Sequence, residues 1–292
     1  MVYVVYDSSF HLGGKGVLFQ SIRSQMNIML QKKTAILAFY IILGLVFCNY
    51  IVNVLHYRGY DVNEMYQPVK LLLLSEENIT VPFGTYFMQI YPILVVLPAG
   101  FSLAADRQLN TTTFLSARVG VKNYFIGKVI AAFFTAFIIF SVPLLLEVLL
   151  NYLSFPKGAM GNLLNINIYS DEYTNIVKHY PFYKIYVTHP YLYAIGWICL
   201  VGVTGGMLNV ITIAISTFRI PYKVLLFLPV YFILQGMYWI GDLFHMKLSH
   251  FFFLRMFPIY QSGYLIFYGT IFILFLLANI IIGVRCWKDY II

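Results

Sequence analysis

The chain has 292 residues, of which 61% are hydrophobic and only 10% are charged. Soluble domains carry about 25% charged residues, so this composition excludes a water-soluble globular protein and indicates an all-α protein that crosses a membrane several times. The formal net charge is +8, but the basic residues are spread over several segments rather than gathered on one face, which argues against a nucleic-acid partner.

The first 33 residues form the expected N-terminal region before the membrane. Between residues 17 and 33, apolar side chains recur every three or four positions. This spacing predicts an amphipathic helix that lies in the plane of the lipid headgroups. Its apolar face would be formed by Leu18, Ile22, Met26, Met29 and Leu30.

Residues 34–292 form the predicted transmembrane domain. A helix needs about 20 apolar residues to cross the roughly 30 Å hydrocarbon core of a bilayer. Six runs approach this length, so six transmembrane helices are expected. These runs are residues 34–55, 86–104, 129–150, 191–216, 224–240 and 264–284.

Basic residues set the expected orientation. Twelve lysines and arginines fall on the side that holds both termini, against seven on the other. The positive-inside rule therefore predicts that both termini and the loop 105–128 are cytoplasmic, and that the loops 56–85, 154–190 and 241–263 are extracellular. The last of these loops contains a very apolar stretch that is too short to span, which favours a re-entrant segment before the final helix.

A few polar and small residues stand out within or beside these runs. Glu147 is the one acid inside a predicted span, and because a carboxylate in a membrane is costly, it is either a pathway residue or a hydrogen-bonded structural one. The glycines of the segment 202–206 predict close helix packing. Asp242, His245 and His250 lack a fourth metal ligand nearby, so they are expected to be solvated or interfacial side chains.

The loop 105–128 is the most informative segment. It carries four basic residues and only one acid, Asp106, and it interleaves them with apolar contact points such as Phe114 and Leu115. A loop of this composition is too polar to cross a bilayer. It is expected to bind a cytoplasmic partner.

Taken together, these features resemble the membrane subunit of a type-2 ABC exporter, a class of permeases for lantibiotics, peptides, drugs and polysaccharides. The resemblance covers the six spans, the inside termini and the N-terminal amphipathic helix. It is most specific in an acid after the second span, a threonine turn, a leucine, a short run with a basic residue, and a lysine that opens the third span. These are Asp106, Thr111-Thr112, Leu115, Ser116-Ala117-Arg118 and Gly127-Lys128.

The resemblance implies that the loop holds a coupling helix, which fits a cleft on a separate ABC ATPase subunit. The sequence contains no P-loop motif, which needs a lysine and backbone amides around the phosphates. The chain is therefore expected to be no enzyme and to hold no cofactor or metal, because ATP and Mg²⁺ would bind the ATPase. The coupling residues would be Asp106, Arg107, Phe114, Leu115, Arg118, Lys122 and Lys128.

A second permease copy or a paralogue would complete the transporter in a bacterial plasma membrane, surrounded by lipids. Cargo would pass between the two permeases, largely along the second and fifth spans. These carry few charges, which suits an amphipathic or hydrophobic cargo such as a peptide toxin, a lantibiotic-like peptide or a drug. The candidate pathway residues are Gln89, Tyr91, Gln235, Tyr238, Trp239 and Glu147.

Two other functions stay open. The long outer loops allow a sensor or immunity protein that binds a toxic peptide without transporting it. An intramembrane lipid-modifying enzyme would need several polar catalytic side chains at one depth, and the predicted spans offer Glu147 as their one acid.

Overall fold

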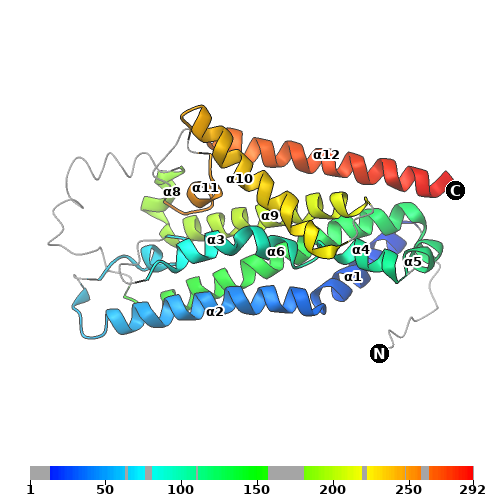
Figure 1. The fold of residues 1–292 in the computed structure, drawn as a ribbon. Coiled ribbons are helices and arrows are strands. Elements are labelled where there is room, and N and C mark those ends of the chain that lie inside the picture. Colours follow the sequence, from blue (N-terminus) through cyan, green and yellow to red (C-terminus); the bar gives the residue numbers. More distant parts are fainter. Residues whose placement is uncertain are drawn as a thin grey trace.

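The computed structural model is an elongated bundle of helices (Figure 1). It describes residues 14–62, 65–75, 81–109, 111–156, 181–218, 222–246, 248–257 and 263–291. Within these ranges every regular element is a helix, which confirms the all-α class. The long helices are α2 (Lys33–His56), α6 (Val121–Ser154), α9 (Pro190–Ser216), α10 (Phe227–Leu243) and α12 (Tyr264–Ile291). The shorter ones are α1 (Gly14–Leu30), α3 (Phe83–Val96), α4 (Ser102–Gln108), α5 (Thr111–Val119), α8 (Tyr183–Thr188), α11 (His250–Phe253) and the 3-10 helices η2 (Pro68–Leu71) and η4 (Lys223–Leu226).

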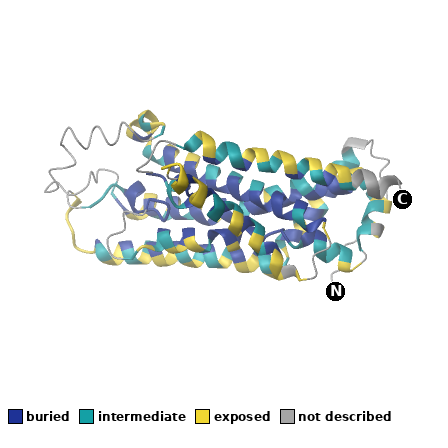
Figure 2. Cartoon of the chain, turned by 45° about the horizontal axis from the view of Figure 1, so that its top comes forward, coloured by how far each residue is buried: buried dark blue, intermediate teal, exposed yellow. Residues whose placement is uncertain are grey.

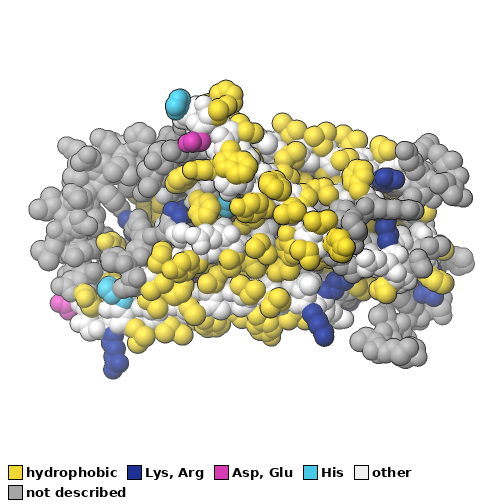
Figure 3. All heavy atoms as spheres, viewed as in Figure 1, with side chains coloured by type: hydrophobic (Ala, Val, Ile, Leu, Met, Phe, Trp, Pro, Cys, Tyr) yellow, Lys and Arg dark blue, Asp and Glu magenta, His cyan; other side chains and the backbone are white. Residues whose placement is uncertain are grey.

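Five helical segments are long and apolar enough to cross a membrane, so the chain is a multi-pass membrane protein. They are Lys33–His56, Val121–Ser154, Pro190–Ser216, Val224–Leu243 and Tyr264–Arg285. They correspond to the first, third, fourth, fifth and sixth of the expected spans. The helices α2, α10 and α12 expose many large apolar side chains, and hydrophobic side chains cover the middle of the face seen in Figure 3.

The second expected span, residues 86–104, is not one continuous helix. The helix α3 ends at Val96 and α4 begins at Ser102, with a turn between them. The 14 residues of α3 extend about 21 Å at 1.5 Å per residue, which is less than the hydrocarbon thickness. Pro98 lies in the turn and has no backbone N–H to continue the helical hydrogen bonds. A sixth crossing therefore stays a prediction.

The helices α6 and α9 form the centre of the bundle, where Figure 2 shows buried residues along their length. Glycines on α9 allow their close approach. A Cβ added at Gly202 would lie 2.3 Å from the Ser141 hydroxyl oxygen, and one at Gly206 would lie 2.7 Å from the Phe133 ring. The packing role expected for this glycine segment is confirmed.

The N-terminal helix α1 packs against the start of α6. The side-chain amide of Gln25 donates to the Tyr124 carbonyl at 3.0 Å, and Gly127 makes room for the contact, since a Cβ there would lie 2.6 Å from the Ser21 hydroxyl oxygen. The buried face of α1 is formed by Ser21, Gln25 and Met29. The other residues of the expected apolar face are only half-buried. An interfacial position for α1 stays a prediction.

Two stretches with only short helices, η2 and α11, are buried at the opposite end of the bundle. Residues 68–75 follow α2 and are buried throughout, and residues 248–257 follow α10 and are mostly buried. The amide of Met256 donates to the Leu74 carbonyl at 3.1 Å, which joins the two stretches. Burial of 248–257 agrees with an apolar segment that folds back into the protein, and its re-entry into a membrane stays a prediction.

Candidate functional site

Helix α5 lies between α4 and α6 in the chain, and a sharp turn at Gly120 joins it to α6. Gly120 separates α5 from α6 with φ +82° and ψ 143°, a backbone conformation that residues with a side chain rarely adopt. Its amide donates to the Ser116 carbonyl at 2.8 Å. The chain thus reverses in one residue, and the nine-residue helix α5 lies at the end of the bundle that also holds α1 and the end of α12 (Figure 1).

A buried ion pair holds α4, the helix before α5, to α6. The Lys128 ammonium pairs with Oδ2 of Asp106, and the two side chains are 4% and 14% exposed. The Tyr124 hydroxyl donates to the same carboxylate oxygen at 2.8 Å, and the Thr111 hydroxyl donates to the Asp106 carbonyl at 3.1 Å. Because the carboxylate offsets the buried ammonium, removal of either partner would strand a charge.

The other expected coupling residues divide into inward and outward groups. Arg107 donates to the carbonyl of Thr217 at 2.5 Å, so it binds the C-terminal end of α9, and Leu115 packs against the core. Phe114 is 75% exposed, and Arg118 and Lys122 are exposed as well. The outer face of α5 and the start of α6 therefore present an aromatic ring with two cations nearby.

Glu147 lies in a hydrogen-bonded cluster between α2, α6 and residues 68–75. Its Oε1 accepts from the side-chain amide of Asn49 at 2.7 Å and from the backbone amide of Leu73 at 2.8 Å. Asn49 and Asn53 both donate to the Leu71 carbonyl. These bonds give Glu147 a structural role in fixing residues 68–75, and its role in a pathway stays a prediction.

His250 is buried, unlike the solvated or interfacial side chain that was expected. Its Nε2 lies 3.1 Å from the Met88 carbonyl, and its ring stacks on Tyr91 with centroids 6.4 Å apart. Burial lowers the pKa of His250 to about 4, so the ring is neutral at pH 7 and donates its Nε2 proton to Met88. Asp242 and His245 are exposed. No group of three metal-ligating side chains occurs among the described residues.

The remaining expected pathway residues do not gather around one cavity within the single chain. Tyr91 is buried against Phe140, whereas Gln89, Tyr238 and Trp239 are exposed on α3 and α10. Gln235 is half-buried on α10. A pathway between two permease copies would need exposed side chains of this kind, so it stays a prediction.

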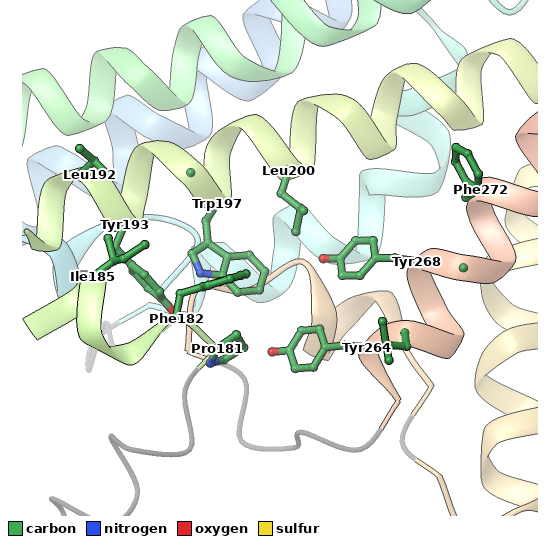
Figure 4. Close-up of a pocket in the computed structure, with 13 residues that line it drawn as sticks. Pro181, Phe182, Ile185, Leu192, Tyr193, Trp197, Leu200, Tyr264, Tyr268 and Phe272 are labelled. Carbon is green, nitrogen blue, oxygen red and sulfur yellow. The ribbon is translucent and has the colours of Figure 1, made fainter.

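Sequence reasoning missed a cavity of about 650 Å³ on the side of the bundle, between α8, α9 and the start of α12. Figure 4 shows Trp197 of α9 facing Tyr264 and Tyr268 of α12. Each of these two helices carries a sequence signal for the cavity, which is a pair of aromatic residues four positions apart with a glycine next to the second one. The pairs are Tyr193 and Trp197 on α9, and Tyr264 and Tyr268 on α12. The lining residues are Pro181, Phe182, Ile185, Leu192, Tyr193, Gly196, Trp197, Leu200, Tyr264, Leu265, Tyr268, Gly269 and Phe272.

Comparison of the chain with protein-family models, with curated proteins and with solved structures gives no match.

Proposed function

We propose that this chain is the membrane subunit of an ATP-driven exporter of the type-2 ABC class. The observation that supports the proposal best is α5, a short helix between α4 and α6 that carries the 75% exposed Phe114. Helix α5 is anchored on both sides, because the Asp106–Lys128 pair ties α4, which precedes it, to α6, which follows it. A rigid, exposed helix is suited to transmit movement from a partner to the membrane helices.

The chemistry of the α5 surface suits a protein partner. An exposed aromatic ring that fills a pocket on the other protein, with cations around it, is a common arrangement at interaction hot spots. The sequence lacks a P-loop, so the energy of ATP would come from that partner. The partner in this proposal is an ABC ATPase, which places the α5 end, α1 and the end of α12 in the cytoplasm.

The cargo in this proposal is amphipathic or hydrophobic, and it moves between two permeases across the plasma membrane. The exposed Gln89, Tyr238 and Trp239 would face the second permease, either another copy or a paralogue. Such side chains offer aromatic contact area and few charges, which favours a peptide toxin, a lantibiotic-like peptide or a drug over a charged polymer.

The test is reconstitution in lipid vesicles with the ABC ATPase encoded beside the gene for this chain. We expect Phe114→Ala to weaken ATPase binding and stimulated ATP hydrolysis at least about tenfold, since loss of an aromatic anchor costs about 2 kcal/mol. Phe244→Ala is the matched control, because Phe244 is also well exposed, at 65%, but directly follows α10 at the opposite end of the bundle from α5 (Figure 1). Equal effects of the two variants, or peptide binding without ATP-dependent transport, would contradict the proposal and favour a sensor or immunity protein.

A further inference from the structure

The cavity between α9 and α12 has the size and chemistry of a binding site for an apolar molecule. Its volume of about 650 Å³ lies within the range of about 300–1,000 Å³ that is typical of small-molecule sites. None of the described residues that line it carries a charge. A charged group would lose its hydration there without gaining a partner, so the part of a ligand that enters must be apolar.

The mouth of the cavity opens onto the side of the bundle, in the direction of lipid. Large apolar side chains on its rim are exposed, among them Leu192 on α9 and Leu265 and Phe272 on α12. Both helices are long and apolar enough to span a membrane, so the surface around the mouth lies against acyl chains. Lipid is therefore the molecule that this opening meets continuously.

The depth of the cavity matches one leaflet. Its lining on α12 runs from Tyr264, the first residue of the helix, to Phe272. Eight residues of helix rise about 12 Å, against about 15 Å for half of the hydrocarbon core. The cavity thus extends from the membrane surface at the α8 end toward the bilayer centre.

Three tyrosine hydroxyls belong to the residues that line the cavity, and one of them is left for a ligand. The hydroxyls of Tyr193 and Tyr268 donate to the carbonyls of Met256 and Phe253, at 2.6 and 2.5 Å. The hydroxyl of Tyr264 is buried and has no partner among the described residues, and it points toward the α8–α9 wall (Figure 4). Tyr264 is the first residue of α12, so we expect it to lie near the ester groups of a phospholipid at the membrane surface.

We propose that this cavity binds a bilayer phospholipid from the leaflet at the α8 end. One acyl chain fills the space between α9 and α12, and the Tyr264 hydroxyl donates a hydrogen bond to an ester carbonyl. The proposal depends on the membrane location of the chain and is independent of the exporter function.

Fluorescence quenching tests the site, because Trp197 lines it and is only 6% exposed. The full chain carries three tryptophans, and Trp239→Phe with Trp287→Phe leaves Trp197 alone. In vesicles of phosphatidylcholine with bromine atoms at mid-chain, we expect Trp197 to be quenched as strongly as the indole of Leu277→Trp, an exposed position on α12 outside the cavity, in a chain whose native tryptophans are all replaced by phenylalanine. Bromine quenches an indole ring only at short range, so strong quenching of Trp197 together with its loss when the cavity is filled requires an acyl chain inside the cavity.

Filling the cavity provides the decisive comparison. A Cβ added at Gly269 or at Gly283 meets no atom within 4 Å, and both glycines lie on α12, but only Gly269 lines the cavity. We expect Gly269→Phe to abolish most of the Trp197 quenching and Gly283→Phe to leave it unchanged. We also expect native mass spectrometry of the detergent-extracted protein to show one bound phospholipid fewer for Gly269→Phe, and a weaker retention of that lipid for Tyr264→Phe.

Three results would overturn the proposal. If Trp197 stays unquenched while the indole of Leu277→Trp is quenched, the cavity is empty or is covered by protein, including a second copy of the chain. If Gly269→Phe leaves Trp197 quenched, bromine reaches the indole from outside the cavity. If Gly283→Phe abolishes quenching as well, the effect comes from a general change in the fold.

Discussion

His250 is a buried base whose neutral form is part of the folded structure. Its ring lies between the Met88 carbonyl and Tyr91, and burial lowers its pKa to about 4. Below pH 6.5 the unfolded chain binds a proton at this position that the folded chain does not bind until about pH 4. The free energy of unfolding therefore falls as pH drops through this window, by about 2 kcal/mol between pH 6.5 and pH 5.

Thermal unfolding in detergent at pH 7 and pH 5 measures this loss. We expect His250→Gln to lower the stability at pH 7 only modestly, because glutamine can still donate to Met88, and to lose most of the difference between the two pH values. His189→Gln changes an exposed histidine and is expected to keep the wild-type difference. An unchanged pH dependence in His250→Gln would show that other groups control acid stability.

The contact between α6 and α9 depends on glycine at some positions and not at others. A Cβ at Gly206 would lie 2.7 Å from the Phe133 ring and 3.0 Å from its carbonyl oxygen, whereas one at Gly196 meets no atom within 4 Å. Both glycines lie on α9, so the same substitution changes helix propensity equally. We expect Gly206→Val to be less stable than Gly196→Val by about 2 kcal/mol, the usual effect of overpacking. Equal unfolding midpoints for the two variants would mean that α6 and α9 can move apart to make room for the side chain at position 206 without a loss of stability.

Hydropathy was sufficient to predict five of the helical segments, because a span is a property of its own residues. The break between α3 and α4 was not predictable in the same way. Its proline is visible in the sequence, but Gly100 also packs there against Thr212 of α9, and a Cβ at Gly100 would lie 2.8 Å from the Thr212 methyl group. A contact across more than one hundred residues leaves no local pattern.

The candidate sites also divide into features that local sequence reveals and features that depend on contacts between distant residues. Glu147 stood out because an acid in an apolar run is conspicuous, yet its partners Asn49 and Leu73 lie 98 and 74 positions away. The exposed Phe114 was expected, since the loop 105–128 combines apolar and basic residues. The cavity between α9 and α12 was missed, because a space between two helices depends on how they diverge and not on either sequence alone.

The two ends of the molecule are built differently. One end carries α5 and the exposed cations Arg118 and Lys122, and the other carries α8 and the buried stretches 68–75 and 248–257 (Figure 1). In membrane proteins, loops rich in lysine and arginine stay in the cytoplasm. The orientation predicted from the sequence therefore places the α5 end inside the cell and the α8 end outside.

Single cysteines test this orientation directly. In a chain whose three native cysteines are replaced by serine, Lys122→Cys marks the start of α6 and Lys184→Cys marks α8, and both positions are exposed. We expect a membrane-impermeant maleimide to label Lys184→Cys in intact cells and to label Lys122→Cys only after the membrane is opened. The reverse pattern would place Phe114 outside the cell, away from any ATPase, and would rule out α5 as the coupling helix. Labelling of both positions in intact cells would mean that the chain does not separate its two ends across the bilayer.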